Sequence, residues 1–440
     1  MRGKHPKPGQ LLVVSYGGVS LIGTLLLMLP WASTAPGATS FLDAWFTAMS
    51  ALTVTGLTVV NTAGHWTLFG QAVILLLIQI GGLGLMVITT MFLIILGLRV
   101  HLGYQVLAAQ DQNYFSFAGI KSLVRSIVFL TLSIELAGTV LLMLTLPDLW
   151  RNGIPYGIFF ALFHAVSAFN GAGFDLTGAS LVPFQHLPWV SIIFSLLISL
   201  GSLGYVVLQE LVGLKFRWHR RLSLHSRLVL IVTIGITLVG AAFYFVTEYG
   251  GLLSGFPLGL KIADSLFQSS TRTCGFTTVP VVKWTEPFQF LMILMMFIGA
   301  SPGSVGGGIK TTTFAVIVLA VWTLARGRKA VVVMEREIDS GNVLKAFTVT
   351  ILASLLVAAG TLALMVVEKI SLLPALFEVV SALATAGLSM GVTQQLSPFG
   401  LILISLFMFI GRIGVLSLIY FIAQTHKRRV GYLKEDILIG

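Results

Sequence analysis

Long and short apolar stretches alternate along the whole chain. The long stretches number eight and form four consecutive pairs: residues 11–29 with 68–98, 122–146 with 188–214, 226–247 with 288–325, and 346–367 with 399–423. Each is near or above the ~20 apolar residues that a helix needs to cross a bilayer. The pattern therefore predicts an all-α membrane protein with eight transmembrane helices.

A shorter apolar segment lies between the two members of each pair. These segments are residues 41–52, 156–169, 260–270 and 373–383. A helix rises about 1.5 Å per residue, so a dozen residues cover only about half of the hydrocarbon core. We expect each short helix to enter the membrane and to return on the same side.

A sequence motif marks the end of the short segments. It reads Phe, three residues, Ser-Ala, four residues and Gly, with copies starting at Phe46, Phe163 and Phe377 and a looser copy at Phe267. Copies about a hundred residues apart predict a fourfold internal repeat. The predicted units are residues 1–100, 101–221, 222–340 with a broken second helix, and 341–426, followed by a tail at 427–440.

The turns after the short helices predict a central ion pore. Non-helical backbone at membrane depth is tolerated only where it is buried in protein or lines water. The side chains around the glycines differ between copies, so backbone carbonyls are the expected ligands of a dehydrated K⁺. Four buried turns with a packing role are the alternative. The predicted filter residues are Thr53, Val54, Thr55 and Gly56; Asn170, Gly171, Ala172 and Gly173; Arg272, Thr273, Cys274 and Gly275; and Ala384, Thr385, Ala386 and Gly387.

Electrostatics supports a monovalent cation at these turns. The short helices end there, and the negative end of a helix dipole favours a cation. The four turns carry no ring of Asp or Glu side chains. The sequence therefore argues against selection of divalent ions by carboxylates.

The third repeat's second long stretch contains five glycines and a proline within ten residues, a composition that breaks a helix. We expect a loop at mid-membrane under the filter. A family resemblance, described below, implies that this loop is a gate, and a structural kink is the alternative. The candidate gate residues are Gly299, Ala300, Ser301, Pro302, Gly303, Ser304, Val305, Gly306, Gly307, Gly308, Lys310 and, from the last repeat, Arg412.

Two basic side chains belong to this candidate gate. Arg412 interrupts an apolar span, where a charge costs roughly 2.5–3.5 kcal/mol on the insertion scale and usually faces a partner or a cavity. It either borders the pore or pairs with a buried acid such as Glu378 or Glu135. Lys310 either caps carbonyls or reaches the cytoplasmic side.

A second glycine motif repeats in phase with the first. It begins at Gly81, Gly201, Gly299 and Gly411, each on the second long stretch of a pair. Small residues let membrane helices approach closely. We expect these glycines to serve helix packing.

Composition and charge agree with a multi-span membrane protein. The 440 residues are 56% hydrophobic and 10% charged, against about 25% charged residues in soluble proteins. The net charge of +11 gathers in alternate loops, which the positive-inside rule places in the cytoplasm together with both termini. This distribution predicts a lipid bilayer as the environment and no nucleic-acid partner. The single cysteine, Cys274, excludes an intrachain disulfide.

Two other classes of protein match parts of the pattern. Gly299 to Gly303 fits the G-x-S-x-G motif, which would make Ser301 the nucleophile of an intramembrane hydrolase. Such a serine needs a general base, and His164 is the only histidine expected within the membrane. Broken helices also mark secondary transporters, but their repeats usually number two. The sequence therefore favours a pore over an enzyme.

The same residues resemble the Trk/Ktr/HKT superfamily of K⁺ transporters over essentially the whole chain. The matching segments are residues 53–57, 167–174, 272–276, 299–313 and 409–414. Without an extra N-terminal helix pair, the chain is more similar to the KtrB type than to the TrkH type. The resemblance implies one filter glycine per repeat, at Gly56, Gly173, Gly275 and Gly387, and an intramembrane gating loop with Arg412 as an electrostatic barrier.

The resemblance also implies partners and a transported ion. It predicts a homodimer in the plasma membrane of a prokaryote, with one pore per subunit, on a cytoplasmic ring of nucleotide-binding subunits of the KtrA/KtrC type. Gly at the first filter position, here Gly56, accompanies K⁺ permeation in this superfamily, whereas Ser accompanies Na⁺. A Na⁺-permeable or Na⁺-coupled transporter is the alternative. One departure is the third segment, where Phe267 and Gly275 lie eight residues apart instead of ten.

Overall fold

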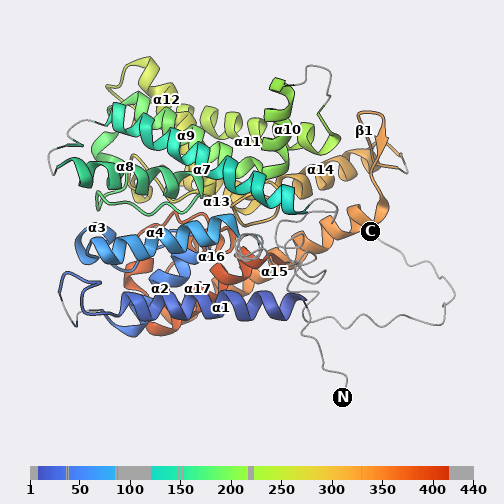
Figure 1. Cartoon of the computed structure of the whole chain (residues 1–440). Helices are drawn as coiled ribbons and strands as arrows, with labels where there is room; N and C mark the ends of the chain where they lie inside the picture. Colours follow the sequence, from blue (N-terminus) through green and yellow to red (C-terminus); the bar gives the residue numbers. More distant parts are fainter. Residues whose placement is uncertain are drawn as a thin grey trace.

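The computed structural model describes residues 8–35, 37, 39–84, 87, 120–146, 149–150, 153–216, 222–328 and 330–415. These residues are mostly helical (Figure 1). The helices are α1 (Pro8–Leu27), α2 (Phe41–Leu52), α3 (Thr62–His65), α4 (Leu68–Leu83), α7 (Ile120–Thr145), α8 (Ile154–Phe169), α9 (Pro188–Leu203), α10 (Tyr205–Phe216), α11 (Leu224–Glu248), α12 (Leu258–Ser270), α13 (Glu286–Ile298), α14 (Thr311–Ala325), α15 (Ser340–Glu368), α16 (Leu372–Ala384) and α17 (Pro398–Ile413).

The remaining elements are short. Four 3₁₀ helices cover Val182–Phe184, Thr271–Thr273, Val281–Lys283 and Thr393–Gln395. The strands β1 (Val332–Val333) and β2 (Arg336–Glu337) form an antiparallel hairpin. In Figure 1 this hairpin lies at the end of the bundle opposite α8 and α12.

The four short helices predicted from the sequence are confirmed as α2, α8, α12 and α16. Each packs against the helix before it, and α2, α8 and α16 also pack against α4, α9 and α17. Polar caps fix several helix starts: Ser40 caps α2 and Thr67 caps α4, each by accepting a backbone N–H from the first turn. Buried Glu248 at the end of α11 accepts the backbone and hydroxyl groups of Thr285, 2.9 and 2.7 Å away, just before α13.

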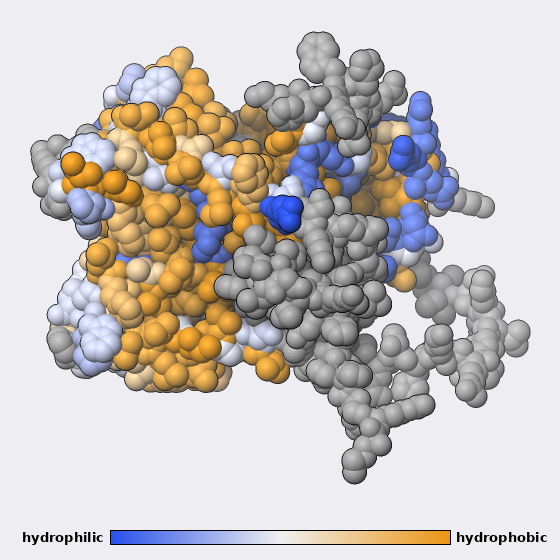
Figure 2. All heavy atoms as spheres, viewed as in Figure 1, coloured by the Kyte–Doolittle hydropathy of each residue, from blue (hydrophilic) through white to orange (hydrophobic). Residues whose placement is uncertain are grey.

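Apolar side chains cover much of the visible flank of the bundle, and polar ones gather near β1 (Figure 2). Among the described residues, α7, α11 and α15 are long and apolar enough to cross a membrane unbroken. The bent pair α9–α10 adds a fourth span if it is counted as one. Helix length alone thus supports three or four of the eight predicted spans within the described residues.

One predicted span is not straight. The sequence pattern gave a continuous helix over residues 188–214, whereas α9 and α10 meet at 104°. Gly204, between them, has a φ of 90°, which is in the region that L side chains rarely adopt. Tyr205 then donates its backbone N–H to the Gly303 carbonyl, at 2.9 Å, so the bend is held by the candidate gate loop.

The second glycine motif serves packing in three of its copies. A β-carbon on Gly81, Gly201 or Gly411 would lie 2.0, 1.8 or 2.1 Å from a carbonyl oxygen at the end of the short helix of the same repeat. Those carbonyls belong to the last turns of α2, α8 and α16. The helices α4, α9 and α17 therefore support α2, α8 and α16 directly, because a glycine lets each pair approach to backbone contact.

We expect Gly201→Ala to lower stability, because its methyl group would overlap the Phe169 carbonyl. Overpacking of this kind costs about 1–3 kcal/mol. The measurement is the thermal midpoint of the purified protein in detergent. Gly235→Ala on α11 is the control, since nothing lies within 4 Å of its added carbon. Equal midpoints for the two variants would contradict the packing assigned to Gly201.

Candidate functional site

The glycines that end the four motif copies lie in one closed ring. A β-carbon on Gly56 would be 1.8 Å from the Ala172 oxygen, and one on Gly173 would be 2.4 Å from the Gly275 nitrogen. The ring continues at Gly275, where an added β-carbon would be 2.9 Å from the Gly387 oxygen. It closes at Gly387, where an added β-carbon would be 1.9 Å from the Thr55 oxygen. Backbone therefore meets backbone around the ring, and no side chain fits at these four positions.

Three of the four turns share one backbone design. In each, the residue before the glycine donates its N–H to the carbonyl of the motif serine, over 2.8 Å at Ser50, 2.8 Å at Ser167 and 2.9 Å at Ser381. Left-handed backbone occurs at the glycine and again two residues earlier. In two copies the serine side chain adds a second anchor: Ser50 Oγ accepts the Gly56 N–H at 3.0 Å, and Ser167 Oγ donates to the Phe174 carbonyl at 2.8 Å.

The third turn differs, as its shorter spacing suggested. α12 is followed by the 3₁₀ helix Thr271–Thr273, and Cys274 is extended with a φ of −157°. Cys274 donates its N–H to the Thr271 carbonyl at 2.8 Å. The tighter 3₁₀ turn and the extended residue bring Gly275 to the ring from a segment two residues shorter.

Three of the short helices, α8, α12 and α16, also carry, directly after the motif phenylalanine, a buried polar residue that hydrogen-bonds to a later part of the chain. His164 Nε2 accepts the Leu176 N–H at 3.3 Å, and Gln268 Nε2 donates to the Thr278 hydroxyl at 2.7 Å. Glu378 accepts the Ser389 hydroxyl at 2.9 Å and the Thr393 hydroxyl. These side chains tie the short helix to the chain that leaves the ring. Sequence reasoning missed this role, although the shared phase after Phe163, Phe267 and Phe377 is the signal that points to it.

The candidate gate loop between α13 and α14 is held by α9 and by the fourth turn. Ser301 donates its N–H to the Ser202 carbonyl at 3.0 Å, and Val305 donates to Gly201 at 3.4 Å. The Gly307 N–H donates to the Thr385 hydroxyl at 2.8 Å. Thr385 is one of the predicted filter residues, so the loop touches the ring itself.

Three basic side chains donate to loop or helix-end carbonyls. Arg272 binds the carbonyl of Gly299, where the loop begins. Lys310 Nζ binds the Gly306 carbonyl at 2.6 Å, which matches the carbonyl-capping alternative for this residue. Arg412 binds the Val305 carbonyl of the loop and the Gly81 carbonyl at the end of α4.

The acidic partners considered for Arg412 are engaged elsewhere. Glu378 accepts hydroxyl groups, and Glu135 accepts the side-chain amides of Gln79 and Asn170. Within the described parts of the chain, the polar contacts of Arg412 are all to backbone carbonyls. Its guanidinium therefore joins the loop to α4, and among the described residues no acid forms a hydrogen bond or an ion pair with it.

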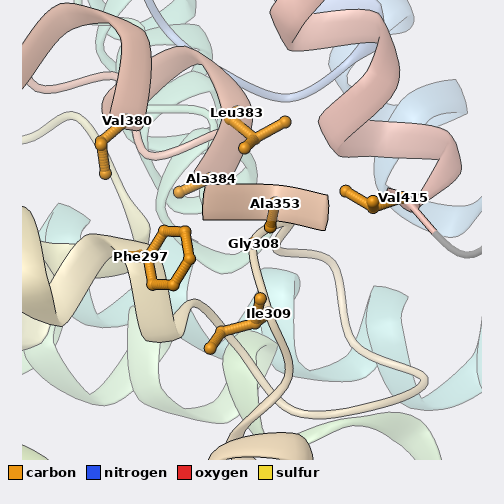
Figure 3. Close-up of a pocket in the computed structure, with 8 residues that line it drawn as sticks. All are labelled: Phe297, Gly308, Ile309, Ala353, Val380, Leu383, Ala384 and Val415. Carbon is orange, nitrogen blue, oxygen red and sulfur yellow. The ribbon is translucent and has the colours of Figure 1, made fainter. Parts of the chain in front are cut away.

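A small apolar cavity lies behind the loop (Figure 3). Gly308 and Ile309 of the loop face Val380, Leu383 and Ala384 of α16 across it. Its other walls are Phe297, Ala353 and Val415. The last part of the loop is thus not packed tightly against α16.

Ser301 lies in the loop with its hydroxyl 3.0 Å from that of Thr311. His164 lies on α8, where its ring contacts the Phe160 carbonyl and the Leu176 N–H. The structure therefore does not bring these two residues together as a nucleophile and base.

Comparison with known proteins places the whole chain in one family. Residues 5–429 match the TrkH family, described as cation transport protein. Ktr system potassium uptake protein D of Bacillus subtilis is 41% identical over 98% of this chain and 97% of its own length. Ktr system potassium uptake protein B of the same organism is 37% identical over the same shares, and the potassium/sodium uptake protein NtpJ of Enterococcus hirae is 33% identical over 99% and 98%.

The fold has a counterpart among solved structures. The crystal structure of the potassium transporter TrkH from Vibrio parahaemolyticus superposes with a TM-score of 0.75 at 20% identity. The match covers 97% of this chain and 87% of that one. Together with the family match over nearly the full length, it establishes that the chain belongs to the TrkH family of cation transport proteins.

Proposed function

We propose that this chain is the membrane pore subunit of a K⁺ uptake system and that the ring of four turns is its selectivity filter. The observation that carries the proposal is the closed contact of Gly56, Gly173, Gly275 and Gly387 through backbone atoms alone. Only main-chain oxygens can serve as ligands in so narrow a ring. They can replace the water that a K⁺ ion loses on entry.

The wider architecture in this proposal is a fourfold repeat. Each unit has a spanning helix, a short re-entrant helix with its filter turn, and a second spanning helix, which gives eight spans around one central pore. Both termini lie in the cytoplasm of a prokaryote, as the distribution of basic residues predicts. The relatives with Ktr system names support a partner subunit. In the proposed assembly, a homodimer of this chain lies on a cytoplasmic ring of nucleotide-binding subunits.

The loop from Gly299 to Lys310 acts as the gate in this proposal. It lies against the filter at Thr385 and is fastened by Arg272 and Arg412. An uncompensated guanidinium below the filter repels a descending cation. A change in the cytoplasmic partner would open the path by displacing the loop from these contacts.

Sodium is the second candidate ion. The relative NtpJ is named a potassium/sodium uptake protein and is 33% identical to this chain. The glycine at position 56 and the two relatives named for potassium uptake favour K⁺. Because the chain belongs to a family of transport proteins, it is not an enzyme, and a hydrolase based on Ser301 is excluded.

We expect Gly56→Asp to lower K⁺ flux by more than about tenfold, because the added side chain would collide with the Ala172 carbonyl and block the ring. The measurement is uptake of K⁺ or Rb⁺ into proteoliposomes, in parallel with Na⁺. Gly64→Asp, at a position with open space around it, is the control. Equal flux through both variants would refute the assignment of Gly56 to the filter.

Shortening the loop by deletion within residues 301–307 should raise K⁺ flux in the absence of any cytoplasmic partner. The deletion removes the contacts of the loop with Ser202 and Thr385 that hold it under the filter. Flux into proteoliposomes with the purified chain alone measures this effect. Unchanged flux from folded protein would show that the loop is a structural kink.

Arg412→Gln should also raise K⁺ flux through the purified chain, by about tenfold or less. The substitution removes the positive charge below the filter and weakens the tie between Val305 and Gly81. Lys369→Gln, at the end of α15, removes an equal charge at a different place and serves as the control. An Arg412→Gln rate equal to that of the wild type would leave this arginine with a structural role only.

A further inference from the structure

A buried acid lies directly behind the second filter turn. Glu135, on α7, is 3% exposed, and its Oε1 accepts the Asn170 side-chain amide at 2.8 Å. Its Oε2 accepts the Gln79 amide at 3.1 Å. Both carboxyl oxygens accept a side-chain amide, so the two hydrogen bonds orient the carboxyl group completely. A filter residue is thus held from behind by a side chain of a different helix.

Asn170 is the first residue of the second filter turn and its side chain makes several contacts there. Besides Glu135, its amide reaches the Gln79 oxygen at 3.5 Å and the Val166 carbonyl at 2.9 Å. Its own oxygen lies so close to Gly82 that a β-carbon there would be 1.8 Å away. Any shift of Glu135 therefore moves the start of the turn.

The same network reaches the gate. Gly82, against which Asn170 packs, offers its carbonyl to the Tyr205 hydroxyl at 3.3 Å and to Arg412 at 3.5 Å. Tyr205 in turn donates its backbone N–H to Gly303 in the loop. The end of α4 thus lies between the gate contacts and the side chain that positions the second filter turn.

We propose that Glu135 is a positioning residue for ion selectivity, acting through Asn170 on the second filter turn. This proposal rests on the K⁺ pathway proposed above. Discrimination between K⁺ and Na⁺ depends on where the carbonyls of the turns are held. The Glu135–Gln79–Asn170 network fixes that position in the second turn, the one turn among the described residues whose first side chain is hydrogen-bonded to a buried acid.

The chemistry of the network defines a sharp test. Glu135→Gln keeps the shape but offers one oxygen and one NH₂ group, so one neighbouring amide then faces a donor instead of an acceptor. If the Gln79 amide flips so that its oxygen accepts from that NH₂ group, its own NH₂ group turns toward the NH₂ group of Asn170. Two donors then face each other at Asn170 instead of at Gln79. Exchanging the two residues, with Glu135→Gln and Gln79→Glu together, restores a carboxylate that accepts both amides.

The measurement is the ratio of K⁺ to Na⁺ flux into proteoliposomes for four proteins. We expect Glu135→Gln to lower the ratio by about fivefold or more, and the exchanged pair to return it to within about twofold of the wild type. Glu248→Gln is the matched control, because Glu248 is an equally buried acid with two hydrogen bonds at the far end of α11. It should leave the ratio unchanged even where it lowers stability.

Three results would overturn the proposal: an unchanged ratio in folded Glu135→Gln protein, an equal loss in Glu248→Gln, or no recovery in the exchanged pair. If Glu135→Gln does not accumulate in the membrane, Glu135→Asp replaces it. That variant keeps the charge but draws it back from Asn170 by one methylene, and it should lower the ratio as well, whereas an unchanged ratio would refute the role. A wild-type chain that carries K⁺ and Na⁺ equally would instead refute the proposed function.

Discussion

The absence of room for a β-carbon where the four turns meet is the constraint on which the rest of the structure depends. Backbone can approach backbone this closely only if each turn is held rigidly from behind, because no side chain fills the centre. The motif serine carbonyls hold the turns at 2.8–2.9 Å from the N–H before the glycine. The short helices are supported in turn by neighbouring helices, which can approach closely because they have glycine at the contact: Gly81, Gly201 and Gly411. The two glycine motifs therefore have the same function, which is to allow backbone contact: one set does so where the turns meet, and the other where a neighbouring helix contacts a short helix.

The third repeat breaks this regularity in both motifs. Its turn contains a 3₁₀ helix and lacks the serine anchor. Its second-motif glycine, Gly299, packs against Gly307 and Gly308 of the loop and not against the short helix. Arg272 binds the Gly299 carbonyl and so supplies the missing support from the filter side. The segment whose turn diverges is thus also the one that provides the loop, and the loop takes the place of the helix contact that supports the other three turns.

The sequence predicted the helices well and the contacts less well. The bounds of α2 were predicted without error, because a repeated motif and long apolar stretches are local signals. The convergence of the glycine turns also followed from the repeat. The bend at Gly204 did not, because a single glycine in an apolar stretch is compatible with a straight helix until its contact with Gly303 is known. The roles of His164, Gln268 and Glu378 depend on partners 10–15 residues away on the leaving chain, and periodicity carries no information on such pairs.

Arg412 shows why the choice between an ion pair and a pore charge needed the structure. A buried guanidinium with a carboxylate partner would be neutralised, and its field would not reach a passing cation. Here the partners are carbonyl dipoles of Val305 and Gly81, which satisfy the N–H donors and leave the net charge in place. The nearby acid Glu135 is instead turned toward Asn170, behind the filter. Both side chains thus act on the end of α4: Arg412 binds the Gly81 and Gly82 carbonyls, and Glu135 binds Asn170, whose side chain packs against Gly82. A displacement of that helix end would therefore move the contacts of the loop and those of the second turn together, which couples gating to selectivity in the pore that we propose.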